Sequence, residues 1–329
     1  MHPLLRAAAE RQFGVFTATD ARRAGYDRDE VRGLLSTGAW VRLRRGVYTT
    51  RERADDAARR HLLDCVAVLL DLGRPQAALS HATAARLHGF LVSTTIDRTT
   101  RVTDPARWRE GKGFRMTRAP LDARSVVVRG PLRVTRAART LVDCAREWDL
   151  ESSVIAMDRA LLMQRTTPAQ LRAALVEQHQ WRGTPMAQRA MALADGRAES
   201  PLETKGRLRL IGAGLAPTEL QVEISVGGRL VAVADAWYED AAVVVEFDGR
   251  VKYTDPWRGK TPQQVLWDEK RREDELRALD IRVVRVVDAD VRAGWPRVEQ
   301  RVRQLLAVPG PARRAFTATP RELGVRRSA

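Results

Sequence analysis

One run of six residues, VVVEFD at Val243–Asp248, limits the possible folds of this chain more than any other feature. Its three consecutive valines indicate a buried strand, and the strand ends in two acids, Glu246 and Asp248. Because side chains alternate along a strand, both acids point to the same face. Carboxylates at the end of a core strand are costly to bury unless a cation balances them. The run therefore predicts an α/β sheet with an acidic site. The alternative is a solvated hairpin turn at Asp248-Gly249.

The segments around this run predict the rest of a sheet domain. Residues 200–203 (SPLE) form a helix start, with a capping serine, proline at the first helical position and an acid at the third. Strands are expected over 221–226, 229–237 and 241–247, a helix over 262–279 and a final strand over 281–287. The order α-β-β-β-α-β is compact enough for one domain. Asp235 lies late on the second strand, so it joins Glu246 and Asp248 as a candidate ligand for Mg²⁺ or Mn²⁺, which prefer grouped oxygen donors.

The first fifty residues have the order of a winged helix-turn-helix. Helices are expected over 4–12, over 17–24 and from residue 27, followed by a strand, an Arg44-Arg45-Gly46 turn and a returning strand. In this arrangement the third helix enters the major groove of DNA, and the turn reaches the adjacent backbone. The arginines in these elements predict a DNA contact: Arg28, Arg32, Arg42, Arg44 and Arg45. The alternative is a small helical bundle with a solvated basic hairpin.

The balance of charge agrees with a polyanionic partner. Lys and Arg number 57 against 41 Asp and Glu, a formal net charge of +16. Each basic contact to a phosphate releases condensed counterions, so the chain favours nucleic acid, here double-stranded DNA. Arg supplies 52 of the 57 basic residues, a bias that a GC-rich genome would also produce. Aromatic residues make up 5% of the chain, too few to predict a stacking platform for RNA.

Cysteine usage and hydropathy predict a cytoplasmic protein that does not enter a membrane. The two cysteines, Cys65 and Cys144, lie far apart in apolar runs, so a disulfide framework is not expected. The first residues lack the long apolar core of a signal peptide, and no apolar run approaches about 18 residues.

The chain is expected to be multidomain, with four parts. These are a winged helix-turn-helix over 1–55, a mainly helical middle domain over 56–190, an α/β domain over 191–310 and a poorly ordered basic tail over 311–329. Strand-like pieces at 101–103 and 125–129 interrupt the helical pattern of the middle domain. Since this part has no evident nucleophile or metal cluster, its expected role is to link and position the other two.

The N-terminal half resembles a known family. GVFTATDARRAGYDRDEVRGLLSTGAWVRLRRGVYTT is similar to the winged-helix region of AbiEi-type antitoxins, which belong to abortive-infection (type IV toxin–antitoxin) systems. LSHATAARLHGF and RVTRAARTLVDCAREW resemble the segment that follows it in those proteins. The similarity covers about residues 5–180. It implies repressor-like DNA binding and, as a further partner, a cognate toxin.

The C-terminal part resembles a second family. VADAWYEDAAVVVEFDG and DEKRREDELRALDIRVVRV, within about residues 197–292, are similar to the very-short-patch repair endonuclease-like branch of the PD-(D/E)XK superfamily, which has a restriction-endonuclease-like fold. The resemblance implies metal ligation by Asp235, Glu246 and Asp248. It also assigns a helical acid to Glu203 and a helical basic residue to Arg272.

Basic residues near this site would neutralise charge that develops in the transition state. The lysine of the superfamily is replaced by Asp248, a replacement usual in this branch, so Lys252, Lys270 or Arg272 would supply the positive charge. Helical periodicity places Arg272 on the face of its helix that carries Leu276, which would turn it toward the sheet.

Two functions follow from these observations. The main hypothesis is a DNA endonuclease dependent on Mg²⁺ or Mn²⁺ that hydrolyses phosphodiester bonds in bacterial defence, with the winged helix recruiting the duplex. The alternative is a non-catalytic AbiEi-like antitoxin and transcriptional repressor, whose nuclease-like domain only binds DNA or a partner. Asp235, Glu246 and Asp248 favour the enzyme, and the replaced lysine favours the regulator.

Overall fold

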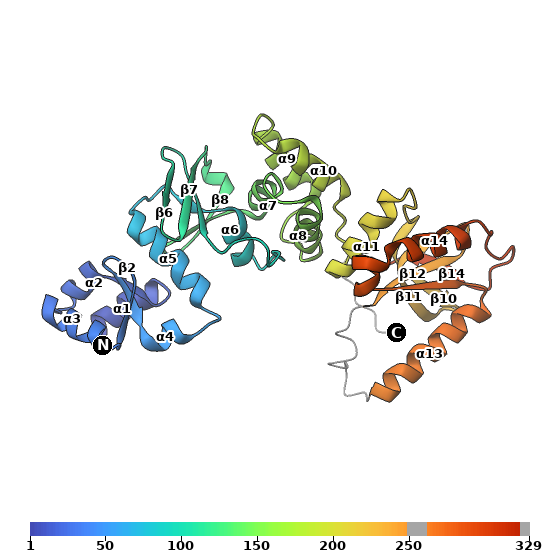
Figure 1. Ribbon diagram of the computed structural model, residues 1–329, viewed down its shortest axis with the longest axis horizontal. Helices are drawn as coiled ribbons and strands as arrows, with labels where there is room; N and C mark the ends of the chain where they lie inside the picture. Colours follow the sequence, from blue (N-terminus) through green and yellow to red (C-terminus); the bar gives the residue numbers. More distant parts are fainter. Residues whose placement is uncertain (249–261, 323–329) are drawn as a thin grey trace. The chain divides into compact units, whose positions relative to one another are not determined.

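The computed structural model describes residues 1–248 and 262–322 (Figure 1). Its internal contacts divide the chain into two units: the first comprises Met1–Trp148 and Pro168–Ala187, and the second comprises Asp149–Thr167 and Gln188–Ala329. This division differs from the boundaries expected at residues 55 and 190, because the winged region and most of the middle part share one unit. Lys252, a predicted basic residue of the site, lies outside the described residues.

The helices and the hairpin predicted for the first fifty residues are present. The elements are α1 (Pro3–Arg11), β1 (Val15–Thr17), α2 (Ala18–Arg23), α3 (Arg28–Ser36), β2 (Trp40–Arg44) and β3 (Val47–Thr50). The strands form an antiparallel sheet in the order β1-β3-β2. Gly25 follows α2 with a φ of 94°, the left-handed conformation predicted for it. Phe16, Trp40 and Tyr48 are buried between the helices and the sheet, with the rings of Phe16 and Trp40 edge to face at 4.7 Å.

The middle of the chain contains a six-stranded sheet, which the expectation of a mainly helical domain missed. Its strands are β4 (Ala78–Leu79), β5 (Thr100–Asp104), β6 (Arg109–Gly111), β7 (Phe114–Arg118), β8 (Val126–Arg129) and β9 (Leu132–Thr135), in the order β6-β7-β5-β4-β9-β8. The strand-like pieces predicted at 101–103 and 125–129 correspond to β5 and β8. The other strands are two to five residues long and rich in Arg and Thr, so their periodicity is too short to be recognised.

Helices complete the first unit. They are α4 (Arg51–Asp55), α5 (Arg60–Leu72), α6 (His81–Leu87), the short 3₁₀ turn Ala123–Ser125, α7 (Ala137–Ala145) and α9 (Pro168–Glu177). Helix α10 (Thr184–Leu193) begins in the first unit and ends in the second. Leu63 and Val66 of α5 pack with Val102 of β5 and Met116 of β7 in one apolar core. This core joins the winged region to the six-stranded sheet, because it also contains Val15 of β1.

The second unit has the order of elements that the sequence predicts, together with further helices and one further strand. The predicted elements are α11 (Pro201–Gly212), β10 (Glu219–Val226), β11 (Arg229–Tyr238), β12 (Val243–Asp248), α13 (Pro262–Ala278) and β13 (Arg282–Val287). The unit also contains α8 (Leu150–Leu162), a π-helical turn at Asp290–Gly294 that leads into α14 (Trp295–Leu306), and β14 (Thr317–Pro320). The sheet order is β13-β12-β11-β10-β14, with β12 and β13 parallel and the other pairs antiparallel.

Helices cover both faces of this sheet (Figure 1). Leu210 of α11 and Val302 of α14 pack with Val245 and Phe247 of β12 on one face. Leu276 of α13 packs with Val244 and other residues on the opposite face. The alternation along β12 therefore directs Glu246 and Asp248 toward the α13 face, as the sequence predicts for side chains of one parity.

Part of the C-terminal tail is a strand, rather than the poorly ordered segment expected. β14 pairs antiparallel with β10, with Val222 opposite Pro320 and Ser225 opposite Thr317. The ring of Phe316 meets Trp237 edge to face at 6.1 Å. The tail is therefore the edge strand of the sheet that carries the predicted acids.

Candidate functional site

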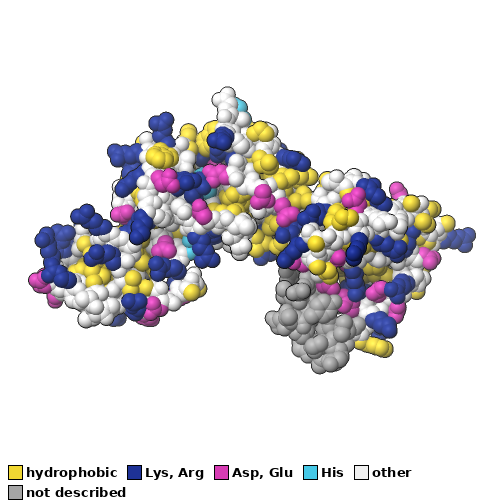
Figure 2. Space-filling model, viewed as in Figure 1, with side chains coloured by type: hydrophobic (Ala, Val, Ile, Leu, Met, Phe, Trp, Pro, Cys, Tyr) yellow, Lys and Arg dark blue, Asp and Glu magenta, His cyan; other side chains and the backbone are white. Residues whose placement is uncertain are grey.

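Helix α3 presents two of the predicted DNA-contacting arginines to solvent. Val31, Leu34 and Leu35 pack against the core of the winged region. Arg28 and Arg32, one helical turn apart, lie on the exposed side. Figure 2 shows Lys and Arg side chains gathered around this end of the chain. The 3.6-residue period of α3 thus buries its apolar stripe and exposes a basic stripe.

The arginines of α3 are only weakly held by neighbouring acids. Asp27 and Glu30 form the capping box at the start of the helix, so their carboxylates bond to backbone amides. Arg32 pairs with Asp29 at 2.7 Å, but the two side chains are 78% and 83% exposed. An ion pair this exposed contributes at most about 1 kcal/mol. Arg32 can therefore exchange Asp29 for another anion at small cost.

The arginines of the β2–β3 hairpin lie in two different environments. Arg42 and Arg45 are exposed. Arg44 instead lies against the six-stranded sheet, where its Nη2 donates to the carbonyl of Lys112 at 2.9 Å and its Nη1 is 3.5 Å from Asp71 Oδ2. Its guanidinium also lies 5.1 Å from the ring centroid of Phe114. The structure thus gives Arg44 a structural anchor rather than the free position predicted for a DNA contact.

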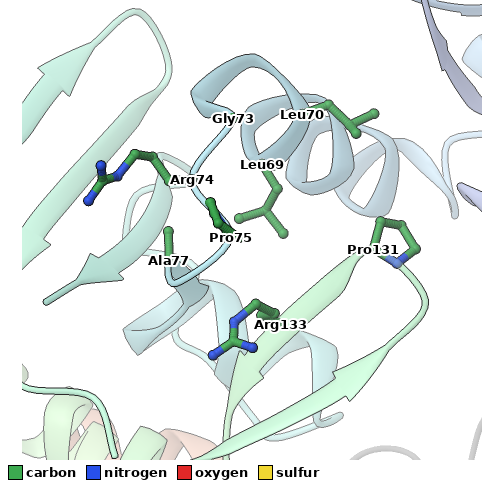
Figure 3. A pocket seen from close by; sticks show the side chains of 8 residues that line it. All are labelled: Leu69, Leu70, Gly73, Arg74, Pro75, Ala77, Pro131 and Arg133. Carbon is green, nitrogen blue, oxygen red and sulfur yellow. The ribbon is translucent and has the colours of Figure 1, made fainter. Parts of the chain in front are cut away.

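A pocket of about 280 Å³ lies near the end of α5 (Figure 3). Its lining residues are Leu69, Leu70, Gly73, Arg74, Pro75, Ala77, Pro131 and Arg133. Arg74 is already committed, since its Nε and Nη2 donate to the carboxylate of Asp104 at 2.9 and 3.0 Å. The lining contains neither an acid nor a nucleophile, so the pocket offers no group for catalysis.

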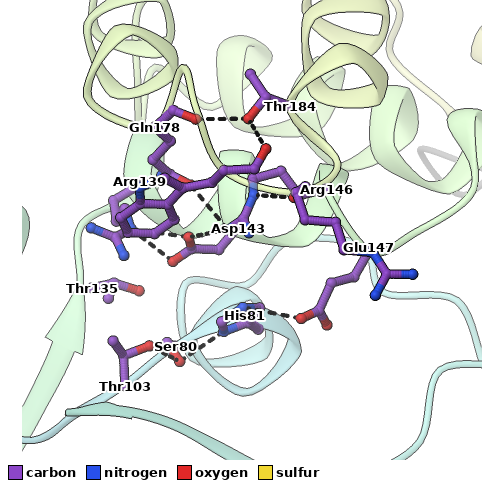
Figure 4. Close-up of polar contacts among 12 residues, drawn as sticks. Ser80, His81, Thr103, Thr135, Arg139, Asp143, Arg146, Glu147, Gln178 and Thr184 are labelled. Atoms are coloured by element: carbon purple, nitrogen blue, oxygen red, sulfur yellow. Dashed lines mark hydrogen bonds and ion pairs between the residues drawn. The ribbon is translucent and has the colours of Figure 1, made fainter. Parts of the chain in front are cut away.

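A hydroxyl, an imidazole and a carboxylate are aligned inside the first unit (Figure 4). The hydroxyl of Thr103 donates to Ser80 Oγ at 2.8 Å, and Ser80 Oγ forms a hydrogen bond with His81 Nδ1, also at 2.8 Å. The Nε2 of His81 lies 3.4 Å from Glu147 Oε1. Burial lowers the pKa of His81, which favours the neutral ring.

This trio is closed to substrates and was not anticipated from the sequence. Ser80 is fully buried and His81 is 4% exposed, so a substrate has no access to the hydroxyl. Glu147 is also held by two hydrogen bonds from Arg101, at 2.7 and 2.8 Å. We assign the trio to the internal polar framework of the first unit.

In the second unit, Gln221 brings together two carboxylates. Its Nε2 donates to Glu203 Oε2 and to Asp235 Oδ1, both at 3.1 Å. Asp235 Oδ2 also accepts from the backbone N–H of Phe247 at 2.7 Å. A left-handed backbone at Gln221, with a φ of 51°, interrupts β10 at this point. The structure thus brings the predicted residues Glu203 and Asp235 together.

The fold favours the protonated form of one acid of this pair. Burial, with the neighbouring Asp235 carboxylate, raises the pKa of Glu203 to about 8. A positive group of the tail also contacts this region: Arg321 Nη2 donates to Gln221 Oε1 at 2.6 Å and to Glu199. The Arg321 side chain is 13% exposed. A residue of the basic tail therefore stands beside the acids, a contact that no motif in the sequence indicates.

Glu246 belongs to a different group of charges, on the α13 face. Arg272 Nη2 donates to its Oε2 at 3.2 Å, and Arg285 Nε of β13 lies 3.5 Å from the same oxygen. Arg272 therefore faces the sheet, as its position on the helix predicts. Glu269 shares both arginines, at 3.7 Å from Arg272 and 3.5 Å from Arg285.

The predicted metal ligands thus have different neighbours. Asp235 is grouped with Gln221 and Glu203, whereas Glu246 is grouped with Arg272 and Arg285. Asp248 is buried at the end of β12, opposite Val287 of β13. Within residues 1–248 and 262–322, no three His, Cys, Asp or Glu side chains are grouped so that they could hold a metal ion. Lys270 is exposed on α13.

Comparisons with known proteins relate the chain to mycobacterial sequences. It is 31% identical over 274 residues to Uncharacterized protein Rv2248 of Mycobacterium tuberculosis (strain ATCC 25618 / H37Rv), covering 83% of this chain and 94% of that protein. Uncharacterized protein MT2308 of Mycobacterium tuberculosis (strain CDC 1551 / Oshkosh) matches with the same figures. The chain belongs to the family of these proteins.

The first part of the chain also matches a regulator family. Residues 3–50 match the family described as "Transcriptional regulator, AbiEi antitoxin". This match runs from α1 through β3, so it includes every predicted DNA-contacting arginine and none of the acids of the second unit. Among solved structures, the RV2827C protein from Mycobacterium tuberculosis aligns with a TM-score of 0.42 and 19% identity, over 66% of this chain and 81% of that one.

None of the helices in the described part of the chain is both long enough and apolar enough to cross a bilayer.

Proposed function

We propose that this protein is a DNA-binding transcriptional regulator that binds its site with α3 and the β2–β3 hairpin. The observation that carries the proposal is the exposed pair Arg28 and Arg32, held on a helix whose opposite side is packed into the core. The match of residues 3–50 to a family of transcriptional regulators supports it. A cognate toxin belongs to the same proposal as a second partner.

The two elements would contribute differently to binding. Arginine reads guanine through bidentate hydrogen bonds in the major groove, so Arg28 and Arg32 would determine sequence preference. Arg42 and Arg45, exposed on the hairpin, would contact phosphates, which position the protein without reading the sequence. Binding should weaken steeply with salt, because phosphate contacts release counterions.

The test measures binding of the full chain to duplexes selected from a random pool. Arg32→Ala should weaken binding to the selected sequence by about tenfold or more and change the sequence preference. Arg45→Ala should weaken binding to all duplexes alike and reduce the salt dependence by about one phosphate contact. Arg124→Ala is the matched control, since that arginine is 91% exposed and lies outside the winged region. Unchanged binding by Arg32→Ala would contradict the proposal.

A metal-dependent DNA endonuclease is the second candidate. The observation that favours it is the Glu203–Gln221–Asp235 group, in which two carboxylates share one amide and one of them has a raised pKa. Such perturbed acids mark candidate functional sites. In the described conformation, however, Glu246 is paired with Arg272 and Arg285, so a divalent ion would have to displace these guanidinium groups from its carboxylate.

Two measurements on the full chain test the second candidate. Plasmid nicking with Mg²⁺ or Mn²⁺ should disappear in Asp235→Ala, with Arg124→Ala as the control. Calorimetric titration of Mn²⁺ should show metal-dependent heat in the wild type and none in Glu246→Gln. Absence of both nicking and heat in the wild type would remove the nuclease and leave the regulator.

A further inference from the structure

A second basic hairpin is fixed beside the β2–β3 hairpin. β6 and β7 pair antiparallel, with Arg109 opposite Met116 and Gly111 opposite Phe114, and they form an edge of the six-stranded sheet. The turn between them consists of Lys112 and Gly113. Arg44 of β2 holds this turn through its hydrogen bond to the Lys112 carbonyl. The two hairpins belong to the same compact unit, so their relative position is part of its fold.

Two glycines allow the tight turn and the close packing within the β6–β7 hairpin. A Cβ on Gly111 would lie 2.4 Å from Phe114 Cε1, so only glycine lets the Phe114 ring lie over β6. Gly113 has a φ of 73°, which suits the tight turn. The Phe114 ring then accepts two guanidinium groups, Arg44 at 5.1 Å and Arg109 at 5.6 Å from its centroid. Positive charge from both hairpins is therefore concentrated at one place.

The β6–β7 hairpin carries more positive charge than its neighbours balance. Residues 107–118 contain five basic residues and one acid, Glu110. Glu110 pairs with Arg115 at 3.0 Å, across the hairpin on the side opposite Phe114. Arg107 and Lys112 are exposed, and among the described residues neither has a carboxylate partner. These two cations and Arg109 are thus available to an anion.

An exposed indole lies among these cations. Trp108 is 65% exposed, a high value for the largest apolar side chain, and it stands between Arg107 and Arg109. Isolated exposed apolar residues are ordinary, but an aromatic flanked by unpaired basic groups is the composition of a nucleic-acid contact. An acidic protein partner would suit the charges equally. The position beside the β2–β3 hairpin, which the proposed function places on DNA phosphates, favours the duplex.

We propose that the β6–β7 hairpin is a second DNA-contacting element, which binds the phosphate backbone of the duplex flanking the site read by α3. Arg107, Arg109 and Lys112 neutralise phosphates there, and Trp108 packs against the adjacent sugars. Arg44 is a positioning residue that fixes the two hairpins relative to each other. The inference rests on the proposed regulator function. It adds that the protein contacts DNA on the flank of the sequence that α3 reads.

The experiment uses the full chain and two duplexes that share the selected sequence. One duplex has the length of the selected core, and the other is extended by about one helical turn at each end. Wild type should bind the longer duplex about tenfold more tightly than the shorter one, with a longer hydroxyl-radical footprint. The combined variant Arg107→Ala, Lys112→Ala should lose this gain and the added footprint, together with about two units of salt dependence on the longer duplex. Trp108→Ala should lose part of the gain.

Matched variants separate this inference from the function on which it rests. Glu110→Gln with Arg115→Gln alters the other face of the same hairpin without changing its net charge, and it should keep the gain from flanking DNA. Arg32→Ala should weaken binding to both duplexes by the same factor. If wild type binds both lengths equally, or if the combined variant keeps the gain, the hairpin proposal is overturned while the regulator stands. If Arg32→Ala changes neither affinity, the regulator and the hairpin proposal both fail.

Discussion

Gly206 of α11 lies so close to the ring of Phe247 on β12 that a Cβ there would be 1.8 Å from Phe247 Cε1. The contact joins the helix that carries Glu203 to the strand that carries Glu246. Phe247 is 5% exposed, and its backbone N–H holds Asp235. The absence of a side chain at Gly206 thus lets α11, which carries Glu203, pack closely against β12, which carries Glu246.

Gly206→Ala should therefore destabilise the protein, although alanine favours helices. The added methyl group forces Phe247 or α11 to move, at a cost of about 3 kcal/mol. Gly212→Ala is the matched control in the same helix, because nothing lies within 4 Å of its Cβ. It should be neutral or stabilise by up to about 1 kcal/mol. Urea unfolding of the full chain measures both, and equal stability of the two variants would contradict the contact.

Asp158 of α8 and Arg207 of α11 form a buried ion pair. Replacing only one of the two residues should strongly destabilise the protein. The two groups lie 2.8 Å apart, with side chains 2% and 6% exposed. Arg207→Met leaves a buried carboxylate without its cation, which costs about 3–5 kcal/mol. The double variant Asp158→Leu, Arg207→Met should recover most of this loss, since no unpaired charge remains. A double variant no more stable than Arg207→Met would show that packing, and not charge, dominates here.

Lowering the pH should stabilise the second unit, because Glu203 becomes protonated. The pKa of Glu203 is about 8 in the fold, against 4.5 for the ordinary group, so the native state binds its proton more tightly than the unfolded state. The free energy of unfolding should therefore fall as pH rises from about 4.5 to about 8. Glu203→Gln should flatten this dependence and gain about 2 kcal/mol at pH 8, since the half-buried charge is gone. Exposed Glu322→Gln is the control, and a variant as pH-dependent as wild type would contradict the assignment.

Arg44→Met should affect stability more than binding to the core sequence. It removes the hydrogen bond to the Lys112 carbonyl and the ion pair to Asp71, in a side chain only 17% exposed. We expect a loss of about 1–2 kcal/mol in unfolding free energy. Arg45→Ala, at the neighbouring exposed position, should cost almost nothing in stability while weakening DNA binding. The opposite pattern would return Arg44 to the DNA-contacting group.

The sequence predicted those elements whose signals are local. The capping box at Asp27 and Glu30, the glycine after α2 and the serine cap of α11 each depend on residues a few positions apart. The order of elements in the second unit followed from periodicity over segments of at least six residues. These parts of the fold were predicted correctly.

The parts that were missed depend on partners far apart in the sequence. Arg44 could not be distinguished from Arg45, because only the fold brings Lys112 and Phe114 to one of them. β14 is short and polar, and only its pairing with β10 makes it a strand. For the candidate acids, residue type and strand parity were predictable from sequence. The sequence did not predict that Asp235 would bond to Gln221 whereas Glu246 would pair with Arg272.

The two units are interleaved along the chain, since residues 149–167 of the second unit interrupt the first. Trp181, beyond this interruption, lies 4.8 Å from the guanidinium of Arg139 and 5.0 Å from that of Arg146. A fragment that stops at Trp148 would leave these two arginines without their aromatic partner. Neither unit can be separated from the other by a single cut, or transferred to another protein by simple end-to-end fusion. An insertion or deletion at any of the places where the chain passes from one unit to the other must be compatible with both folds.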